Sequence, residues 1–121
     1  MDEFFALALT ASFCLAGHAL ADGLQGRLSM LKRRRLRDGH VKKIAEWAPF
    51  LAAHGGWHAI AAGAVLASPE AMICEWAAHC AIDFCKCEGR IGAVTDQILH
   101  LACKAAWIAI WGVPAWASSV F

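Results

Sequence analysis

Apolar residues along this chain fall into four long segments, and short polar stretches separate them. The segments cover residues 4–24, 47–66, 69–87 and 95–113. The first holds about 21 residues, which at about 1.5 Å per residue crosses the roughly 30 Å hydrocarbon core of a bilayer. The pattern predicts an all-α fold, an integral membrane bundle of four transmembrane helices, in which residues 1–121 form a single membrane domain.

Residues typical of helix boundaries stand at the ends of these segments. Ser68 is a candidate N-cap, Pro69 suits the first helical position, and Glu70 places a carboxylate in the first turn. Pro114 follows the fourth segment and cannot continue a helix. Between the first two segments, residues 25–46 are predicted to form a basic cytoplasmic loop.

Composition supports the membrane interpretation. Hydrophobic residues make up 60% of only 121 residues, more than the core of one soluble domain of this size needs to bury. The chain starts with MDEFF, which is acidic where a signal peptide is basic, so we expect the first helix to be retained.

Charge is strongly segregated along the chain, although the net charge is only +1. Most basic residues lie between the first two apolar segments: Arg27, Lys32, Arg33, Arg34, Arg35, Arg37, Lys42 and Lys43. Lys and Arg are retained on the cytoplasmic side, and the third loop, with Lys86 and Arg90, lies on the same side of a four-helix chain. We therefore expect a multi-pass protein with both termini outside.

The basic stretch allows two interpretations. It could serve only as a topogenic signal, or it could also hold anionic lipid headgroups. The residues for the second role are Lys32, Arg33, Arg34, Arg35 and Arg37. Nucleic acid is not an expected partner, because no aromatic residues interleave with these charges. The lipid bilayer is the expected partner, and the sequence leaves the oligomeric state open.

Ionisable residues recur inside the apolar segments in an order that follows helix direction. The inward first and third segments read His before Asp, as His18 and Asp22, and His79 and Asp83. The outward fourth segment reads Asp96 before His100. Because of this reversal, the aspartates fall roughly 5 Å and the histidines roughly 10 Å from the cytoplasmic boundary. The second segment contributes His54 and His58.

One turn deeper, Glu75 and Lys104 reach matching depths and predict a buried ion pair. A charged side chain at a helix centre costs about 3 kcal/mol on insertion scales, so the polar faces should point at each other. Such groups are usually pathway or catalytic residues in membranes. The alternative is that they only hydrogen-bond and fix helix register, as in a non-enzymatic membrane accessory protein.

Imidazoles backed by carboxylates suit a divalent metal, with zinc the first choice and manganese or iron also compatible. The candidate ligands are His18, Asp22, His54, His58, His79, Asp83, Asp96 and His100. A catalytic site would leave one position for water and use Asp83 or Asp96 as general base, which indicates a metal-dependent hydrolase. The same residues could instead relay protons, and no HExxH motif supports the hydrolase.

Four segments together resemble domain-of-unknown-function family 3307. They are GHALADGLQGRLSMLK, LAAHGGWHAI, AHCAIDFCK and DQILHL, and they span roughly residues 9–109. The matching residues are His18, Asp22, Gln25 and Lys32, the pair His54 and His58, then His79, Asp83 and Lys86, and finally Asp96, Gln97 and His100. The family groups small bacterial and phage integral-membrane proteins. The resemblance implies the bacterial inner membrane and an unassigned activity.

Overall fold

The structure is a computed structural model and describes the backbone of residues 2–37 and 44–120. The side chains of residues 24–46 lie outside the described part. The helices are α1 (Asp2–Arg37), α2 (Ile44–Leu66), α3 (Pro69–Cys87), α4 (Ala93–Trp111) and α5 (Ala115–Ser118). No strand occurs among the described residues, which confirms the predicted all-α class.

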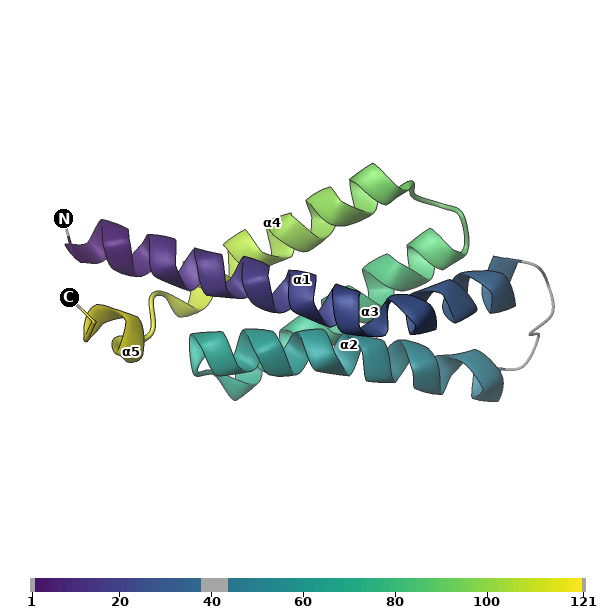
Figure 1. Ribbon diagram of the computed structural model, residues 1–121, viewed down its shortest axis with the longest axis horizontal. Helices are drawn as coiled ribbons and strands as arrows, with labels where there is room; N and C mark the ends of the chain where they lie inside the picture. The colour runs from purple at the N-terminus through teal and green to yellow at the C-terminus, as the bar shows by residue number, and fades with distance from the viewer. Residues whose placement is uncertain (1, 38–43, 121) are drawn as a thin grey trace.

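The four long helices alternate in direction along one axis (Figure 1). Both termini, α5 and the turn between α2 and α3 lie at one end of the bundle. The C-terminal end of α1, the start of α2 and the turn between α3 and α4 lie at the other end. This up-and-down order is the one that the topology prediction requires of its four segments.

Helix bounds agree best where capping residues mark them. α3 covers Pro69–Cys87, as predicted, and Ser68 caps it by accepting a hydrogen bond from Ala71 N at 3.1 Å. α4 ends at Trp111, where Gly112 adopts a φ of 77° that glycine tolerates. The predicted N-cap is therefore confirmed, whereas α4 covers Ala93–Trp111 rather than residues 95–113, because the chain leaves the helix at Gly112, before Pro114.

The loop predicted over residues 25–46 needs correction. α1 continues to Arg37 and α2 begins at Ile44, so helix occupies most of that stretch. Between Arg27 and Arg37 the chain is rich in Arg, Leu and Lys, which favour helix, and it contains no proline or glycine, so α1 can continue to Arg37. Because its side chains lie outside the described residues, the lipid contacts expected of the basic cluster stay a prediction.

Small residues let the helices approach closely. A Cβ on Gly17 of α1 would lie 3.2 Å from Ala61 Cβ on α2. A Cβ on Gly63 of α2 would lie only 2.7 Å from Met72 Cβ on α3. Close approach at glycine and alanine is typical of helix packing in membranes.

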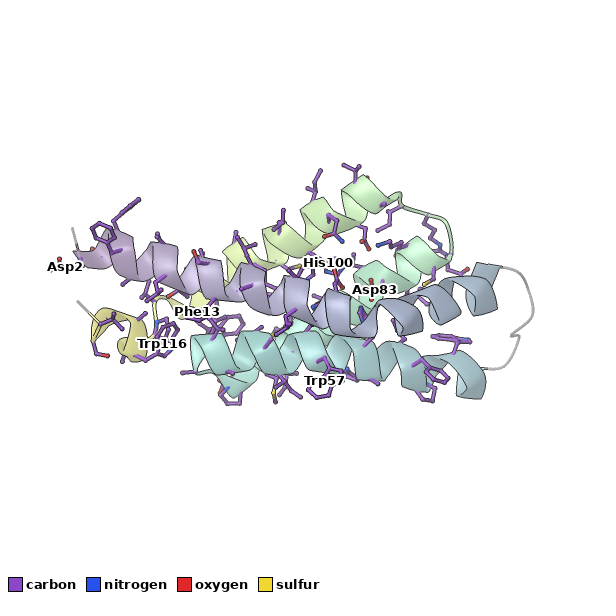
Figure 2. The ribbon with its side chains drawn as sticks, in the orientation of Figure 1. Asp2, Phe13, Trp57, Asp83, His100 and Trp116 are labelled. Atoms are coloured by element: carbon purple, nitrogen blue, oxygen red, sulfur yellow. The ribbon has the colours of Figure 1, made fainter. Side chains whose placement is uncertain are left out.

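The short helix α5 was not predicted, and it closes the end of the bundle where the termini lie. Trp116 donates a hydrogen bond to Val65 O at 2.7 Å, which ties α5 to the end of α2. Its ring also meets Phe13 of α1 edge-on at a centroid distance of 5.6 Å, as Figure 2 shows. These contacts position α5 across α1 and α2.

The bundle has a polar interior and an apolar exterior. Among the residues whose side chains are described, eleven polar or charged ones are buried, including Glu75, His79 and Asp96. Large apolar side chains point outward on every long helix, including Leu20 on α1 at 63% exposure and Trp57 on α2 at 56% (Figure 2). Among the described residues, one segment, Asp2–Gly23 of α1, is long and apolar enough to cross a membrane by length and composition, so the four membrane spans stay a prediction.

Candidate metal centre

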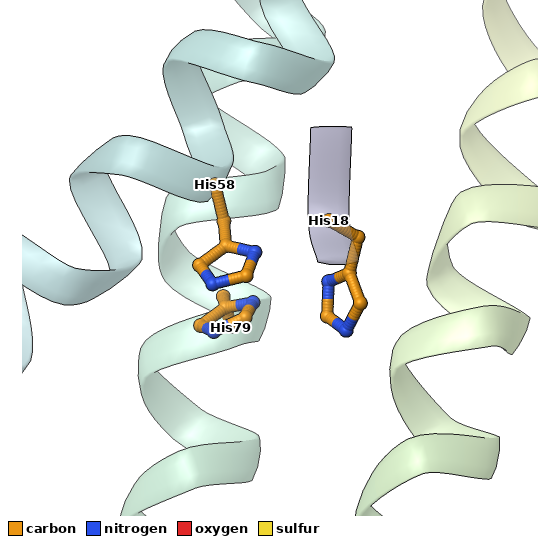
Figure 3. Close-up of side chains that lie close together, drawn as sticks. All are labelled: His18, His58 and His79. Atoms are coloured by element: carbon orange, nitrogen blue, oxygen red, sulfur yellow. The ribbon is translucent and has the colours of Figure 1, made fainter. Parts of the chain in front are cut away.

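Five histidines meet inside the bundle, and they come from all four long helices. His18 lies on α1, His54 and His58 lie one turn apart on α2, His79 lies on α3, and His100 lies on α4. Each is between 1% and 8% exposed. Figure 3 shows three of these rings side by side between their helices.

His79 is at the middle of this group. The rings of His58 and His100 stack on it at centroid distances of 3.7 Å and 4.1 Å. The rings of His54 and His18 follow at 5.2 Å and 5.7 Å. The predicted convergence of the four helix faces is thus present in the structure.

Asp22 and Asp83 each lie beside several of these rings. Asp22 Oδ1 is 3.2 Å from His58 Nε2 and 3.7 Å from His54 Nε2, and its Oδ2 is 3.5 Å from His18 Nε2. Asp83 Oδ2 is 3.4 Å from Nε2 of both His54 and His79. The spacing of four residues between His18 and Asp22 and between His79 and Asp83 puts each pair on one helix face.

Asp96 is fully buried at the start of α4, and its two oxygens have different surroundings. Oδ2 accepts hydrogen bonds from Lys86 Nζ and, at 3.1 Å, from Gln97 Nε2. Oδ1 has no hydrogen-bond partner and lies 3.6 Å from His100 Nε2. Lys86 and Gln97 therefore fix the carboxylate so that Oδ1 faces the histidines.

A second polar layer lies one turn from the histidines toward the end with the termini. Lys104 of α4 forms a buried ion pair with Glu75 of α3, which confirms the predicted pair. Trp107 Nε1 donates a hydrogen bond to Glu75 Oε2 at 2.6 Å, while Glu75 Oε1 lies 3.4 Å from His79 Nδ1. Glu75 thus connects this layer to the central imidazole.

The histidine nitrogens lack partners that a buried polar atom needs. Both ring nitrogens of His18, His58 and His79 are buried without a hydrogen bond, although carboxylate oxygens lie 3.2 to 3.5 Å from several of them. These oxygens are close but misaligned. A buried nitrogen without a partner costs about 1–3 kcal/mol, so such a group calls for a bound water or ion. The residues present therefore fit a metal ion.

In the described part of the chain, four groups of three side chains are compact enough to hold an ion, with the ligand atoms of each group within 4.8 Å of one another. They are His18 with His58 and His79, Asp22 with His54 and His58, His54 with His79 and Asp83, and Asp83 with Asp96 and His100. Imidazole nitrogens and carboxylate oxygens are the ligands that zinc and related divalent metals take. All eight residues predicted as ligands belong to at least one group.

Sequence reasoning missed parts of the surroundings of these ligands. Lys86 was assigned to the cytoplasmic loop, yet it pairs with Asp96 inside the bundle. Its position three residues after Asp83 on α3 was the available signal. The hydrogen bond from Trp107 to Glu75 had no signal in the sequence, because tryptophan in an apolar segment is ordinarily a packing or interfacial residue.

Comparison with protein-family models, with curated proteins and with solved structures finds no match to this chain. The resemblance to domain-of-unknown-function family 3307 therefore stays a prediction from the sequence.

Proposed function

We propose that this chain is a four-span protein of the bacterial inner membrane whose interior binds a divalent metal, zinc first, and catalyses a hydrolytic reaction near the cytoplasmic face. The observation that carries the proposal is the set of buried imidazoles without hydrogen-bond partners at the convergence of α1, α2 and α3. A buried ring nitrogen without a hydrogen bond destabilises a protein interior, whereas the same nitrogen is a common metal ligand.

The bundle has apolar side chains outside and ionisable side chains inside, and this arrangement supports a membrane setting for all four long helices. Ile73 on α3 and Ile98 on α4 are 63% and 58% exposed, while four charged side chains of the same helices are buried: Glu75, Asp83, Asp96 and Lys104. In water this surface would be an unusually large apolar patch. In a bilayer, it is the face that contacts lipid, and the buried ionisable residues are those that hydrocarbon would exclude.

Buried ionisable residues also account for the lower hydropathy of three of the long helices, which leaves α1 with the one candidate span among the described residues. α2, α3 and α4 each carry histidine or charged side chains on the face that points inward, and these lower the mean hydropathy of the helix. α1 carries only His18 and Asp22 within Asp2–Gly23 after its acidic first turn. Large apolar side chains are exposed on each of the four helices.

Imidazoles and carboxylates of the centre would have different roles, one in binding the metal and the other in orienting its ligands. The imidazoles would bind the metal, and the carboxylates one turn away would hold the ring orientations. A bound divalent metal would supply a Lewis acid that polarises a carbonyl or phosphoryl oxygen of a substrate. A general base is expected among Asp22, Asp83 and Asp96, each of which has an oxygen 3.2 to 3.6 Å from an imidazole nitrogen.

Metal analysis tests this proposal. Untagged protein purified in detergent and dialysed against metal-free buffer is expected to retain at least one zinc per chain after zinc loading, and His79→Ala is expected to retain less zinc than the wild type. His40→Ala is the matched control, since it removes the one histidine that is not among the ligands predicted from the sequence. Zinc-free wild-type protein would overturn metal binding and leave helix packing as the role of the polar residues.

A further inference from the structure

Asp83 occupies a singular position, because its two oxygens face different sets of histidines. Oδ2 lies 3.4 Å from the Nε2 atoms of His54 and His79, on α2 and α3. Oδ1 lies 3.6 Å from His100 Nε2 on α4 (labelled with Asp83 in Figure 2). A carboxylate that presents one oxygen to each of two ligand sets has the geometry of a bridge.

The two ligand sets are complete on either side of this carboxylate. His54 and His79 with Asp83 form one compact group, and Asp83 with Asp96 and His100 form the other. All five side chains are buried, between 0% and 6% exposed. Each set supplies three protein ligands, which is the number that catalytic zinc sites use.

Asp96 has one carboxylate oxygen free to act as a ligand in the second set. Its Oδ2 is already bound by Lys86 and Gln97, so only Oδ1 is available, and that buried atom has no hydrogen-bond partner. Lys86 and Gln97 therefore hold the carboxylate of Asp96 so that its Oδ1, which has no hydrogen-bond partner, faces His100. A carboxylate that served only to orient His100 would instead accept a hydrogen bond from its ring.

Ligand number also exceeds what one ion needs. Eight side chains belong to groups of suitable size, whereas tetrahedral zinc takes four ligands. More ligands are therefore present than one ion binds, and the two groups that share Asp83 contain five of the eight side chains.

From these observations, we propose that the centre binds two divalent metal ions, with Asp83 as the bridging carboxylate. The first ion takes His54, His79 and Asp83 Oδ2, and the second takes Asp83 Oδ1, Asp96 and His100. This inference rests on the proposed metal-binding function and extends it to a second ion. Because Asp83 and Asp96 become ligands, Asp22 is the carboxylate that stays available as general base.

The two positions differ in chemical character. Two imidazoles and one carboxylate surround the first, and one imidazole and two carboxylates surround the second. Imidazole-rich sites suit zinc, and carboxylate-rich sites suit manganese or magnesium. The second position should therefore exchange zinc for manganese more readily than the first.

Metal stoichiometry and metal–metal distance test the proposal without an activity assay. Untagged, detergent-purified protein loaded with Zn²⁺ or Mn²⁺ is expected to hold two ions per chain. X-ray absorption should then give a metal–metal distance of about 3.5–4 Å, and the Mn²⁺ form should show a spin-coupled electron paramagnetic resonance signal.

Variants separate the two positions. Asp96→Asn and His100→Ala are each expected to lower the content from two ions to one and to abolish the metal–metal signal, while helical circular dichroism stays that of the wild type. The matched control is Thr10→Val, which replaces a buried polar residue of α1 outside the centre and should keep two ions.

The outcomes distinguish this inference from the proposed function. One ion per chain in saturated wild-type protein, or two ions without a short metal–metal distance, would overturn the bridged pair and leave a metal-binding centre intact. A protein that binds none would overturn both.

Discussion

Glu75 contacts three different side chains of the interior. It pairs with Lys104, accepts a hydrogen bond from Trp107, and lies 3.4 Å from His79 Nδ1. A metal-binding imidazole usually directs its other nitrogen to a carboxylate, which fixes the tautomer and the ring plane. Glu75 can do this for His79, whose Nε2 then faces Asp83.

The ion pair between Glu75 and Lys104 predicts a characteristic pattern of stability. Glu75→Gln or Lys104→Met alone should each lower the free energy of unfolding by about 3–5 kcal/mol, because the remaining partner stays buried and charged without a counter-ion. The double variant should be less destabilised than either single variant. Unfolding followed by circular dichroism in detergent, on protein kept free of metal, measures these differences.

Additive losses in the double variant would contradict a direct pair. Thr10→Val serves as a control for the loss of a buried polar group that has only a local hydrogen bond, to Ala6 O at 2.9 Å. Its effect should stay well below that of either charged substitution.

Most of the centre could be predicted at the residue level, because helical periodicity and chain direction are visible in the sequence. The spacing of His79 and Asp83 and the reversed order of Asp96 and His100 sufficed to bring these residues together. Depth counting placed His58 one turn away from the other rings, whereas its ring stacks on His79 at 3.7 Å. Counting along straight helices ignores tilt and side-chain rotamers, which decide the last few ångströms.

At the scale of helices, the contact between α2 and α3 depends on glycine. Gly63 lies within α2, and a Cβ there would come 2.7 Å from Met72 Cβ and 3.3 Å from Ser68 O. Neither neighbour is the free end of a flexible side chain. The backbones of the two helices must therefore separate if Gly63 is replaced.

Gly63→Ala should destabilise the bundle by about 1–3 kcal/mol, the usual cost of overpacking a tight contact. Gly56→Ala on the same helix is the matched control, because a Cβ there meets nothing within 4 Å. That control should be neutral or should stabilise by about 0.5–1 kcal/mol through higher helix propensity. Thermal unfolding of both variants in the same detergent provides the comparison, and equal shifts would count against the tight contact.

Helix bounds could be predicted where the chain itself contains a stop signal. Ser68 and Pro69 determine the start of α3, and Gly112 and Pro114 follow the end of α4. α1 passes its apolar segment and runs on to Arg37, since a polar surface does not end a helix. α5 has only four residues and depends on contacts such as that of Trp116 with Phe13, which no local pattern reveals.

For the whole molecule, the up-and-down order leads to a definite topology in the proposed membrane setting. Lys86 and Arg90 lie at or beyond the end of α3, and the C-terminal part of α1, which carries the basic residues up to Arg37, lies at the same end of the bundle. Positive residues remain in the cytoplasm, so that end should face inward. The termini and α5 should face outward.

Reporter fusions can test this topology in cells. A fusion at Glu88 is expected to report the cytoplasm, and one after the last residue is expected to report the outside. Replacing Lys32, Arg33, Arg34, Arg35 and Arg37 with Gln should weaken the asymmetry and give mixed signals. A cytoplasmic signal from the C-terminal fusion of the wild type would show that the number of spans or their orientation differs from the proposal.

The paired charges of α3 and α4 have a consequence for biosynthesis. Glu75 and Lys86 on α3 meet Lys104 and Asp96 on α4, so the two helices carry complementary charges in antiparallel order. Each charged side chain costs about 2.5–3.5 kcal/mol near the centre of a lone inserted helix. In the proposed membrane setting, α3 leaves the ribosome first and would enter lipid with its charges unmatched. Entry as a hairpin with α4 avoids that cost, and sliding one helix by a turn would separate both pairs, so the same contacts select the partner and the register during insertion.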